Sequence, residues 1–249
     1  MQVLKISLIT VTFNAEDTIK RCIESVLAQD YNHIEYIIVD GASTDNTLNI
    51  IAQYKHRTQI VISEPDSGIY DAMNKGIRAA TGQIIGMLNA DDVFAAPDVL
   101  SRVACAFATT ETSIVYGNLN YMKPEGQIIR IWHAGSYRVG AFNFGWMPPH
   151  PTFYCHKRLF DEFGYYDTQY GTAADYELML RFIHANGLWP YYLNRLMINM
   201  EVGGVSNKNF SNRLKAWKFD LKAMGKNGVL FPHLAIVLKP LRKIFQYMF

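Results

Sequence analysis

Two apolar runs, each leading to acidic residues, constrain the fold of this 249-residue chain more than any other feature. Residues 84–88 lead to Asp91 and Asp92, and residues 37–39 are followed directly by Asp40. Short apolar runs of this kind are typical of buried strands. Ligands of open α/β sheets bind outside the carboxyl ends of the strands. We therefore expect both acidic sites to lie at one crevice.

The first hundred residues alternate between strand and helix patterns. Strands are predicted over residues 6–13, 34–39, 60–63 and 84–88, with a helix between each pair. The first helix has one apolar face, made of Ile19, Cys22, Ile23, Val26 and Leu27. Residues 41–46 supply cap residues for the second helix, and Gly82 stands at the expected stop of the third. This order predicts a parallel, Rossmann-like sheet that is covered by helices on both faces.

Length and composition fit one large α/β domain with an appendage, because 49% of the residues are hydrophobic. No apolar run reaches the roughly 20 residues that a membrane-spanning helix needs. The N-terminus lacks the pattern of a signal peptide, so a cytoplasmic location is expected. Cys22, Cys105 and Cys155 are odd in number and widely spaced, which predicts reduced core thiols rather than disulfides or a metal cluster.

The acidic pair predicts a metal site. The first predicted strand is not followed by G-x-G-x-x-G, and G-x-x-x-x-G-K-[ST] occurs nowhere, so no glycine-rich loop can hold a pyrophosphate. Asp91 and Asp92 are suited to Mg²⁺ or Mn²⁺, which would take its other ligands from phosphate oxygens and water. In the alternative interpretation, one of the two aspartates caps a following helix.

Several segments carry a specific family resemblance. They are TVTFN (10–14), SVLAQ (25–29), IVDGASTD (38–45), EPDSGIYDAMNKGI (64–77), NADD (89–92), HPTF (150–153) and AADYELMLR (173–181). Over residues 4–205 the chain thereby resembles the inverting nucleotide-sugar glycosyltransferases of family 2, which have the GT-A fold. It looks like the small bacterial enzymes that build surface polysaccharides or glycolipids. The resemblance implies a glycosyltransferase domain over residues 1–205, with a nucleotide-sugar-binding half (1–95) and an acceptor half (96–205). The remaining residues, 206–249, are expected to form a basic, amphipathic, helical C-terminal segment.

The resemblance implies a donor site for a nucleotide sugar, with UDP as the expected nucleotide. It assigns Asp40 to the base. It assigns Thr12 and the segment that follows it, as far as Asn14, to the ribose and base. The stretch from Asn89 through Ala90 to Asp91 corresponds to the metal-binding D-x-D signature. An amide stands at its first acidic position, so the choice between Asp91 and Asp92 as the ligand stays open. Asp66, Gly68 and Lys75 are expected near the sugar diphosphate.

The resemblance also implies a general base, Asp175, near the start of a buried helix. Asp175 would take the proton of an acceptor hydroxyl, and attack opposite the leaving group would invert the anomeric centre. A capping role for Asp175 is the alternative, and Glu177 is the second candidate for the base. His150 is expected near the donor phosphates or the acceptor, with a structural histidine as the alternative. Residues 203–206 are expected to form a loop that closes beside the site.

Two other classes of function compete with this interpretation. A nucleotidyltransferase would share the Rossmann-like half and the metal carboxylates, but it would carry a glycine-rich basic loop after its first strand. Residues 12–17 do not form such a loop. A non-catalytic nucleotide-sugar-binding protein would bind donor and metal without transfer. The expected partners are therefore a nucleotide-sugar donor and a glycan or lipid-linked acceptor.

The last 44 residues are strongly basic. Residues 206–249 contain nine Lys and Arg residues and one acid, Asp220, although the net charge of the chain is only +2. Leu214, Trp217, Leu221 and Met224 predict one amphipathic helix, and an apolar stretch lies at residues 229–238. Apolar and cationic residues together predict peripheral contact with the inner face of the plasma membrane. Packing on the catalytic domain or in a homodimer is the alternative, and nucleic acid is not expected because no recognition motif accompanies the charge.

Overall fold

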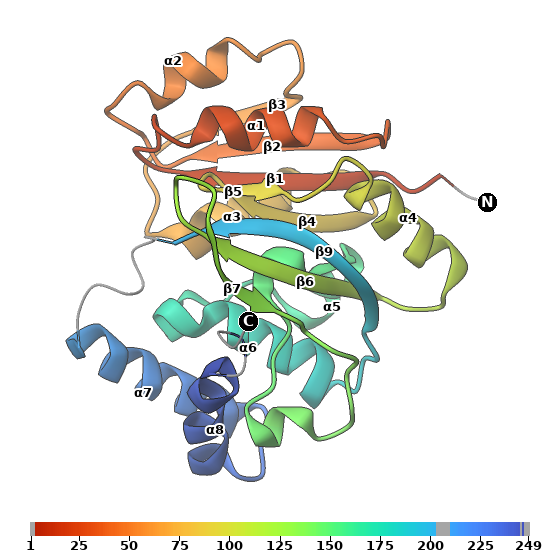
Figure 1. Cartoon of the computed structure of the whole chain (residues 1–249), viewed down its shortest axis with the longest axis vertical. Helices are drawn as coiled ribbons and strands as arrows, with labels where there is room; N and C mark the ends of the chain where they lie inside the picture. Colours follow the sequence, from red (N-terminus) through yellow and green to blue (C-terminus); the bar gives the residue numbers. More distant parts are fainter. Residues whose placement is uncertain (1–2, 203–209, 245, 247–249) are drawn as a thin grey trace.

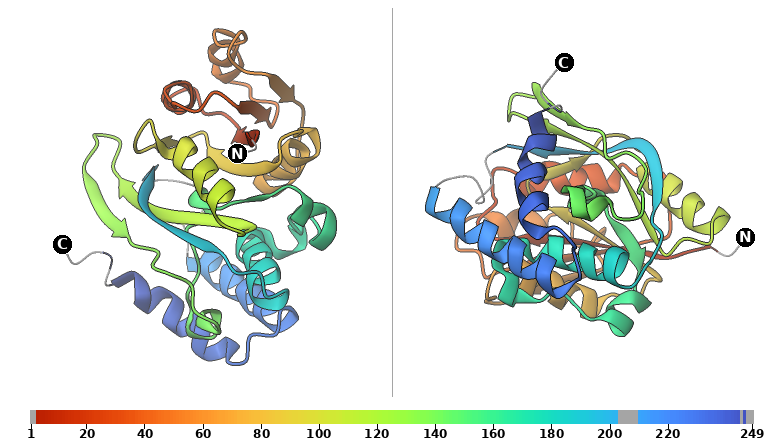
Figure 2. Two further views of the ribbon diagram at one scale, coloured as in Figure 1. Left: turned by 90° about the vertical axis from the view of Figure 1, so that its right-hand side faces the viewer. Right: turned by 90° about the horizontal axis from the view of Figure 1, so that it is seen from below.

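The computed structural model describes residues 3–202, 210–244 and 246. Within these residues one sheet of nine strands runs through the molecule, with helices on both of its faces (Figures 1 and 2). The strands are β1 (Ile6–Thr12), β2 (Ile34–Asp40), β3 (Ile60–Ser63), β4 (Ile84–Asn89), β5 (Asp92–Phe94), β6 (Ile114–Met122), β7 (Ile128–Trp132), β8 (Tyr154–His156) and β9 (Tyr191–Glu201). The α-helices are α1 (Ile19–Leu27), α2 (Thr47–Ala52), α3 (Ile69–Ala79), α4 (Val99–Thr109), α5 (Arg158–Phe163), α6 (Ala174–Met179), α7 (Phe210–Lys226) and α8 (Pro232–Ile244). Three 3₁₀ segments, η1 (Ala141–Phe144), η2 (His150–Thr152) and η3 (Thr168–Ala173), and a π-helical segment, η4 (Leu180–Ala185), complete the described elements.

The predicted Rossmann-like half is confirmed. The sheet order begins β3-β2-β1-β4, and these four strands are parallel. Every residue of β1 is buried, because α1 covers one face of the sheet and α3 covers the other. In register, Thr12 lies beside Asp40 and Val11 lies beside Asn89. The carboxyl ends of β1, β2 and β4 therefore meet at one edge, as the two acidic sites predicted.

The second half of the sheet is mixed. Strand β8 is antiparallel to β4, β6 is antiparallel to β8, β9 is parallel to β6, and β5 is antiparallel to β9. Asp91 therefore lies between β4 and β5, and Asp92 is the first residue of β5. The alternative in which one of these aspartates caps a following helix is wrong.

Gly82 has a different role from the one that its position suggested. Helix α3 ends at Ala79, and Ala80 is already extended. A Cβ at Gly82 would lie 2.6 Å from Oγ of Ser7 and 2.7 Å from the carbonyl oxygen of Lys5. The glycine is required by its close approach to the β1 backbone rather than by the helix stop.

Helices α7 and α8 pack on the second half of the domain, where α7 contacts η3 and α6 and α8 contacts η1 (Figure 2). Met224, Ala235 and Ile236 are buried in this contact. Trp217 is 48% exposed, so the predicted apolar face of α7 is wrong at this position. The buried side of α7 passes through Asp220 instead. No helix in the described ranges has the length and apolar character needed to cross a membrane.

The three thiols are unpaired, as predicted, and two of them lie in the core. Cys22 and Cys155 are buried, whereas Cys105 is exposed on α4. The prediction of a core position is therefore wrong for Cys105. Ala104 and Ala106, the neighbours of Cys105 in the chain, are buried instead, because the inward face of α4 includes them and not the cysteine.

Candidate active site

Asp40 closes the turn after β2. Its Oδ2 accepts hydrogen bonds from the backbone N–H of Ser43 at 3.0 Å and from Oγ of Ser63 at 2.7 Å, and its Oδ1 accepts one from Oγ of Ser43. The side chain has no exposed surface. The carboxylate of Asp40 therefore fixes the turn after β2 and joins it to the end of β3 at this edge of the sheet.

Asn14 locks the first loop to the second. Its Oδ1 accepts a hydrogen bond of 2.9 Å from the backbone N–H of Thr44, and its own N–H donates to Oγ of Ser43 at 2.8 Å. The backbone is left-handed at Asn14 (φ 47°), a conformation that asparagine tolerates better than most residues. Thr12 is buried at the end of β1, and its Oγ1 has no hydrogen-bond partner among the described residues. Of these two predicted ligand-binding residues, Thr12 has the uncommitted polar atom.

An aromatic side chain lies at the same edge, and sequence reasoning gave it no role. Phe13 follows β1 and is 62% exposed. A Cβ at Gly41 would lie 2.6 Å from Oδ2 of Asp66 and 3.4 Å from Cδ2 of Phe13. The missing side chain of Gly41 thus leaves room for the carboxylate of Asp66, with the ring of Phe13 at the same edge. An exposed ring directly after a buried strand was the signal that could have identified this residue.

Gly68 and Lys75 belong to the loop that carries Asp66. The backbone N–H of Gly68 donates to Oδ1 of Asp66 at 2.8 Å, and α3 begins at the next residue. Nζ of Lys75 lies 2.9 Å from Glu64 and donates to the carbonyl oxygen of Pro65 at 2.7 Å. The hydrogen bond to Glu64 raises the pKa of Lys75. The structure therefore brings the three predicted residues together, with Lys75 fixing the loop.

The two aspartates of the acidic pair differ in exposure. Asp92 has no exposed surface, and its Oδ2 accepts a hydrogen bond of 3.2 Å from Nδ2 of Asn89. Its Oδ1 has no partner within the described part of the chain. Burial and then the charge of Asp91 raise the pKa of Asp92 well above its usual range. Asp91 is half-buried, and Ala90 between them is buried.

Two further charged residues lie beside this pair. Nη2 of Arg21, from α1, donates to the carbonyl oxygen of Asp91 at 3.2 Å and forms an ion pair with Glu201 at the end of β9. Burial and then the charge of Glu201 raise the pKa of Asp91. Sequence reasoning missed both residues, because α1 and β9 meet β4 only through the sheet topology.

Asp175 lies in the first turn of α6, as predicted, and its Oδ1 accepts a hydrogen bond of 2.7 Å from the N–H of Tyr176. Burial and then the charge of Asp175 raise the pKa of Tyr70, whose hydroxyl donates to the carbonyl oxygen of Thr172 at 3.4 Å. Nε2 of His150 lies 2.8 Å from the hydroxyl of Tyr166. Burial lowers the pKa of His150, and the charge of Asp175 opposes that shift. Tyr70, His150 and Tyr166 therefore surround the predicted base.

Most of the aromatic residues between 132 and 154 belong to the core. Trp146, Phe153 and Tyr154 are buried, whereas Trp132 and His133 line a cavity on the side of the sheet that faces α8. The loop predicted at residues 203–206 lies outside the described residues.

Comparisons with solved structures define the class of protein. TarS of Staphylococcus aureus, solved in complex with UDP-GlcNAc, aligns with a TM-score of 0.70 and 17% identity over 90% of this chain and 66% of its own. The mannosyltransferase PcManGT of Pyrobaculum calidifontis, solved with GDP-Man and Mn²⁺, aligns with a TM-score of 0.69 and 16% identity over 96% of this chain and 73% of its own. The fold is that of the GT-A glycosyltransferases.

The family follows from the sequence comparisons. Residues 7–166 match the model of glycosyl transferase family 2, and the chain belongs to this family. A PGL/p-HBAD biosynthesis glycosyltransferase of Mycobacterium bovis is 31% identical over 217 residues, which cover 84% of this chain and 83% of the relative. An uncharacterised glycosyltransferase of Mycobacterium tuberculosis is 31% identical over 192 residues, which cover 71% of this chain and 68% of the relative. The protein is therefore a glycosyltransferase.

Proposed function

We propose that this glycosyltransferase is inverting and metal-dependent, and that it moves a sugar from a UDP-sugar donor to a hydroxyl of a glycan or lipid-linked acceptor. One observation carries the proposal. The carboxylate of Asp175 lies close enough to Tyr70 for its charge to raise the pKa of that residue. Tyr70 stands two residues after Gly68, whose backbone N–H donates to Asp66. The residue suited to activate an acceptor hydroxyl is thus next to the segment expected to hold the donor.

Asp91 is the residue that we assign to the metal, with Asp92 behind it. Asp91 is accessible, and Oδ1 of Asp92 lacks a partner in the described residues, so the pair fits a hard divalent cation. Among the described residues no three His, Cys, Asp or Glu side chains converge on one point. Donor phosphates and water would therefore complete the ligand set. Bound Mg²⁺ or Mn²⁺ would neutralise the charge that develops on the nucleoside diphosphate.

Side chains of this chain would activate the acceptor and bind the rest of the donor. Asp175 accepts the proton of the attacking acceptor hydroxyl. Tyr70 and Tyr166 lie near that carboxylate, and its charge contributes to raising the pKa of both. His150 stays neutral, because burial lowers its pKa, and orients Tyr166 through the 2.8 Å contact. Thr12 and Phe13 would bind the nucleoside, and Asp66 would lie near the sugar diphosphate. Attack by one hydroxyl in a single displacement inverts the anomeric centre.

The similar proteins support this assignment. TarS was solved with UDP-GlcNAc and PcManGT with GDP-Man and Mn²⁺. The relative from Mycobacterium bovis is named for PGL/p-HBAD biosynthesis. We assign this chain to the biosynthesis of a bacterial surface polysaccharide or glycolipid, at the cytoplasmic face of the plasma membrane. A homodimer that uses the C-terminal helices is the alternative to membrane contact.

A donor screen tests the proposal. The purified chain is incubated with UDP-sugars and GDP-sugars, with Mn²⁺, with Mg²⁺ or with a chelator, and release of nucleoside diphosphate is measured. We expect release from one UDP-sugar that stops in the chelator and in Asp91→Asn. The exposed control Asp30→Asn should behave as the wild type. Release of pyrophosphate would favour a nucleotidyltransferase, and donor binding without any release would favour a binding protein.

A further inference from the structure

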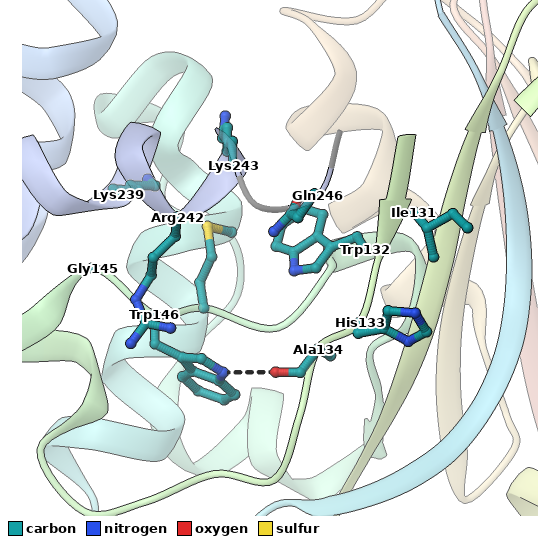
Figure 3. Close-up of a pocket in the computed structure, with 11 residues that line it drawn as sticks. Ile131, Trp132, His133, Ala134, Gly145, Trp146, Lys239, Arg242, Lys243 and Gln246 are labelled. Atoms are coloured by element: carbon teal, nitrogen blue, oxygen red, sulfur yellow. Dashed lines mark hydrogen bonds between the residues drawn. The ribbon is translucent and has the colours of Figure 1, made fainter. Parts of the chain in front are cut away.

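A cavity of about 290 Å³ lies between β7, the end of η1 and α8 (Figure 3). Its principal side chains are Trp132, His133, Trp146, Lys239, Arg242 and Lys243. The described residues that line it include three Lys or Arg residues and no Asp or Glu, and one of the three, Lys239, pairs with Asp220 outside the lining at 2.9 Å. Such a lining suits an anionic group that is attached to something less polar.

The walls of the cavity are fixed by hydrogen bonds. Nε1 of Trp146 donates to the carbonyl oxygen of Ala134 at 2.9 Å, as the dashed line in Figure 3 shows. Nε of Arg242 donates to the carbonyl oxygen of Phe144 at 3.0 Å. This bond uses one of the five N–H groups of the guanidinium and ties α8 to η1. The cationic side of the cavity is therefore positioned before any ligand arrives.

Helix α8 exposes an apolar stripe on the side turned away from Lys239 and Lys243, with Arg242 at its border. Leu234, Val237 and Leu241 are spaced by three and four residues and are 45%, 53% and 45% exposed. The opposite side of the helix is buried through Ala235 and Ile236. Leu230, Phe231 and Phe144 are also exposed. We call these three residues and Leu234, Val237 and Leu241 together the apolar stripe. A contiguous apolar surface with a cationic border is the pattern of an interfacial membrane helix.

We propose that the apolar stripe and Arg242 at its border bind the surface of an anionic phospholipid bilayer. The stripe enters the boundary of the acyl chains, and Arg242, at the edge of the cavity, contacts the phosphate of a lipid headgroup. This inference deepens the proposed function, on which it rests only for the idea that the acceptor is lipid-linked. The site adjoins the acceptor half, because Nζ of Lys239 lies 3.6 Å from the ring centroid of Tyr176, the neighbour of Asp175.

Charge favours a bilayer over a second copy of the chain. Asp220 is the one acid of residues 206–249, and it already pairs with Lys239 at 2.9 Å. A second copy of the chain would bring its own basic C-terminal segment to this face, with nine Lys and Arg residues against one acid. Anionic headgroups neutralise these charges, whereas the second subunit adds to them.

Vesicle flotation tests the site with the full chain. Phosphatidylcholine vesicles are compared with vesicles that also contain phosphatidylglycerol, in low and high salt. We expect the wild type to float only with the anionic vesicles and mainly in low salt. The double variant Leu234→Glu, Val237→Glu should not float, and Arg242→Gln should bind about fivefold more weakly. Matched controls are Val61→Glu, at an exposed position of the edge strand β3, and Lys20→Gln on α1.

Circular dichroism and nucleoside diphosphate release without lipid are measured for each variant. Retained release with lost flotation supports the site and leaves the proposed function intact. The site is overturned if the wild type ignores anionic vesicles in low salt, if neutral vesicles bind it equally, or if the stripe variant floats like Val61→Glu. It is also overturned if the wild type is a dimer that Leu234→Glu, Val237→Glu makes monomeric while flotation persists. Absent release with normal flotation would instead count against the proposed function alone.

Discussion

Nη2 of Arg181 lies 2.8 Å from Oε2 of Glu177, whose side chain has no exposed surface. Oε1 of Glu177 also lies 3.4 Å from Nζ of Lys226 and accepts a hydrogen bond of 3.3 Å from Nδ2 of Asn227. The carboxylate thereby joins α6 to the end of α7. Because its oxygens already have partners away from solvent, Glu177 is a structural residue, and we retain Asp175 as the proposed base.

Exchange of each acid for its amide should separate the two roles. We expect Asp175→Asn to lower kcat by on the order of a hundredfold or more, with an unchanged KM for the donor, because a general base is lost. Glu177→Gln should leave kcat near the wild-type value at low temperature. It should lower the free energy of unfolding by about 3 kcal/mol, because Arg181 loses its buried counter-charge. Steady-state kinetics and thermal unfolding measure both effects, and the reverse pattern would show that the base has been misassigned.

Gly41→Ala should weaken donor binding. The new methyl group would stand 2.6 Å from Oδ2 of Asp66, so the Asp66 side chain must move from its present position. We expect an increase in the Kd for UDP of about tenfold, as for the loss of one good polar contact. Calorimetric titration of UDP measures this change. Gly225→Ala is the control, because the space around Gly225 on α7 is open within 4 Å, and it should leave the Kd unaltered.

Glu35 should make the fold sensitive to acid. Burial alone would raise the pKa of Glu35. Hydrogen bonds from Lys5, Ser7 and Thr81 outweigh that effect and lower this pKa to about 2. The unfolded chain then binds the proton first, so this stability is present above about pH 4.5 and is lost as the pH falls towards 2.

Removal of this carboxylate gives a direct measurement. At neutral pH we expect Glu35→Gln to lower the free energy of unfolding by about 2 kcal/mol, because hydrogen bonds to a charged group are lost. Between pH 4.5 and 2 the difference from the wild type should shrink. Urea unfolding at several pH values measures both quantities. Glu111→Gln, at an exposed position, should change neither. A constant difference across this range would contradict the assignment.

His150 should reduce stability in mildly acidic solution. Burial lowers its pKa below the ordinary 6.5, and the nearby charge of Asp175 only opposes this shift. The unfolded chain therefore takes up the proton at a higher pH than the folded chain, and stability falls as the pH drops below 6.5. We expect His150→Gln to show a smaller drop in Tm between pH 7 and pH 5.5 than the wild type. The exposed control His56→Gln should keep the wild-type drop.

Local patterns were sufficient for the parallel half of the sheet. The apolar run of residues 34–39 and the spacing of Ile19, Cys22 and Ile23 predicted β2 and α1, because period and composition reflect which face of an element is buried. The position of Asp40 and Asp91 at one edge followed from the same rules, since parallel strands joined by right-handed crossovers end on the same side. Family resemblance, and not periodicity, supplied Asp175.

Other features depended on partners that are distant in the chain. Asp66 packs against Gly41 only because the glycine has no side chain, and Arg21 meets Glu201 only because β9 ends beside β5. Trp217 faces outward because the side of α7 with Asp220 and Met224 packs on η3 and α6. In each case a periodic pattern says that some face is buried, but not against which element.

The sequence by itself thus determined the parallel half of the sheet and the edge at which its carboxylates gather, because these follow from local periodicity and from the right-handed crossovers that join successive parallel strands. Only the tertiary structure decided that Asp92 is buried while Asp91 is accessible, that Glu177 is bound to Arg181, and that α8 keeps an apolar side exposed. These outcomes depend on desolvation and on charge partners, which are set by whatever element covers each side chain. Such covering is a property of the assembled fold and leaves no local signal.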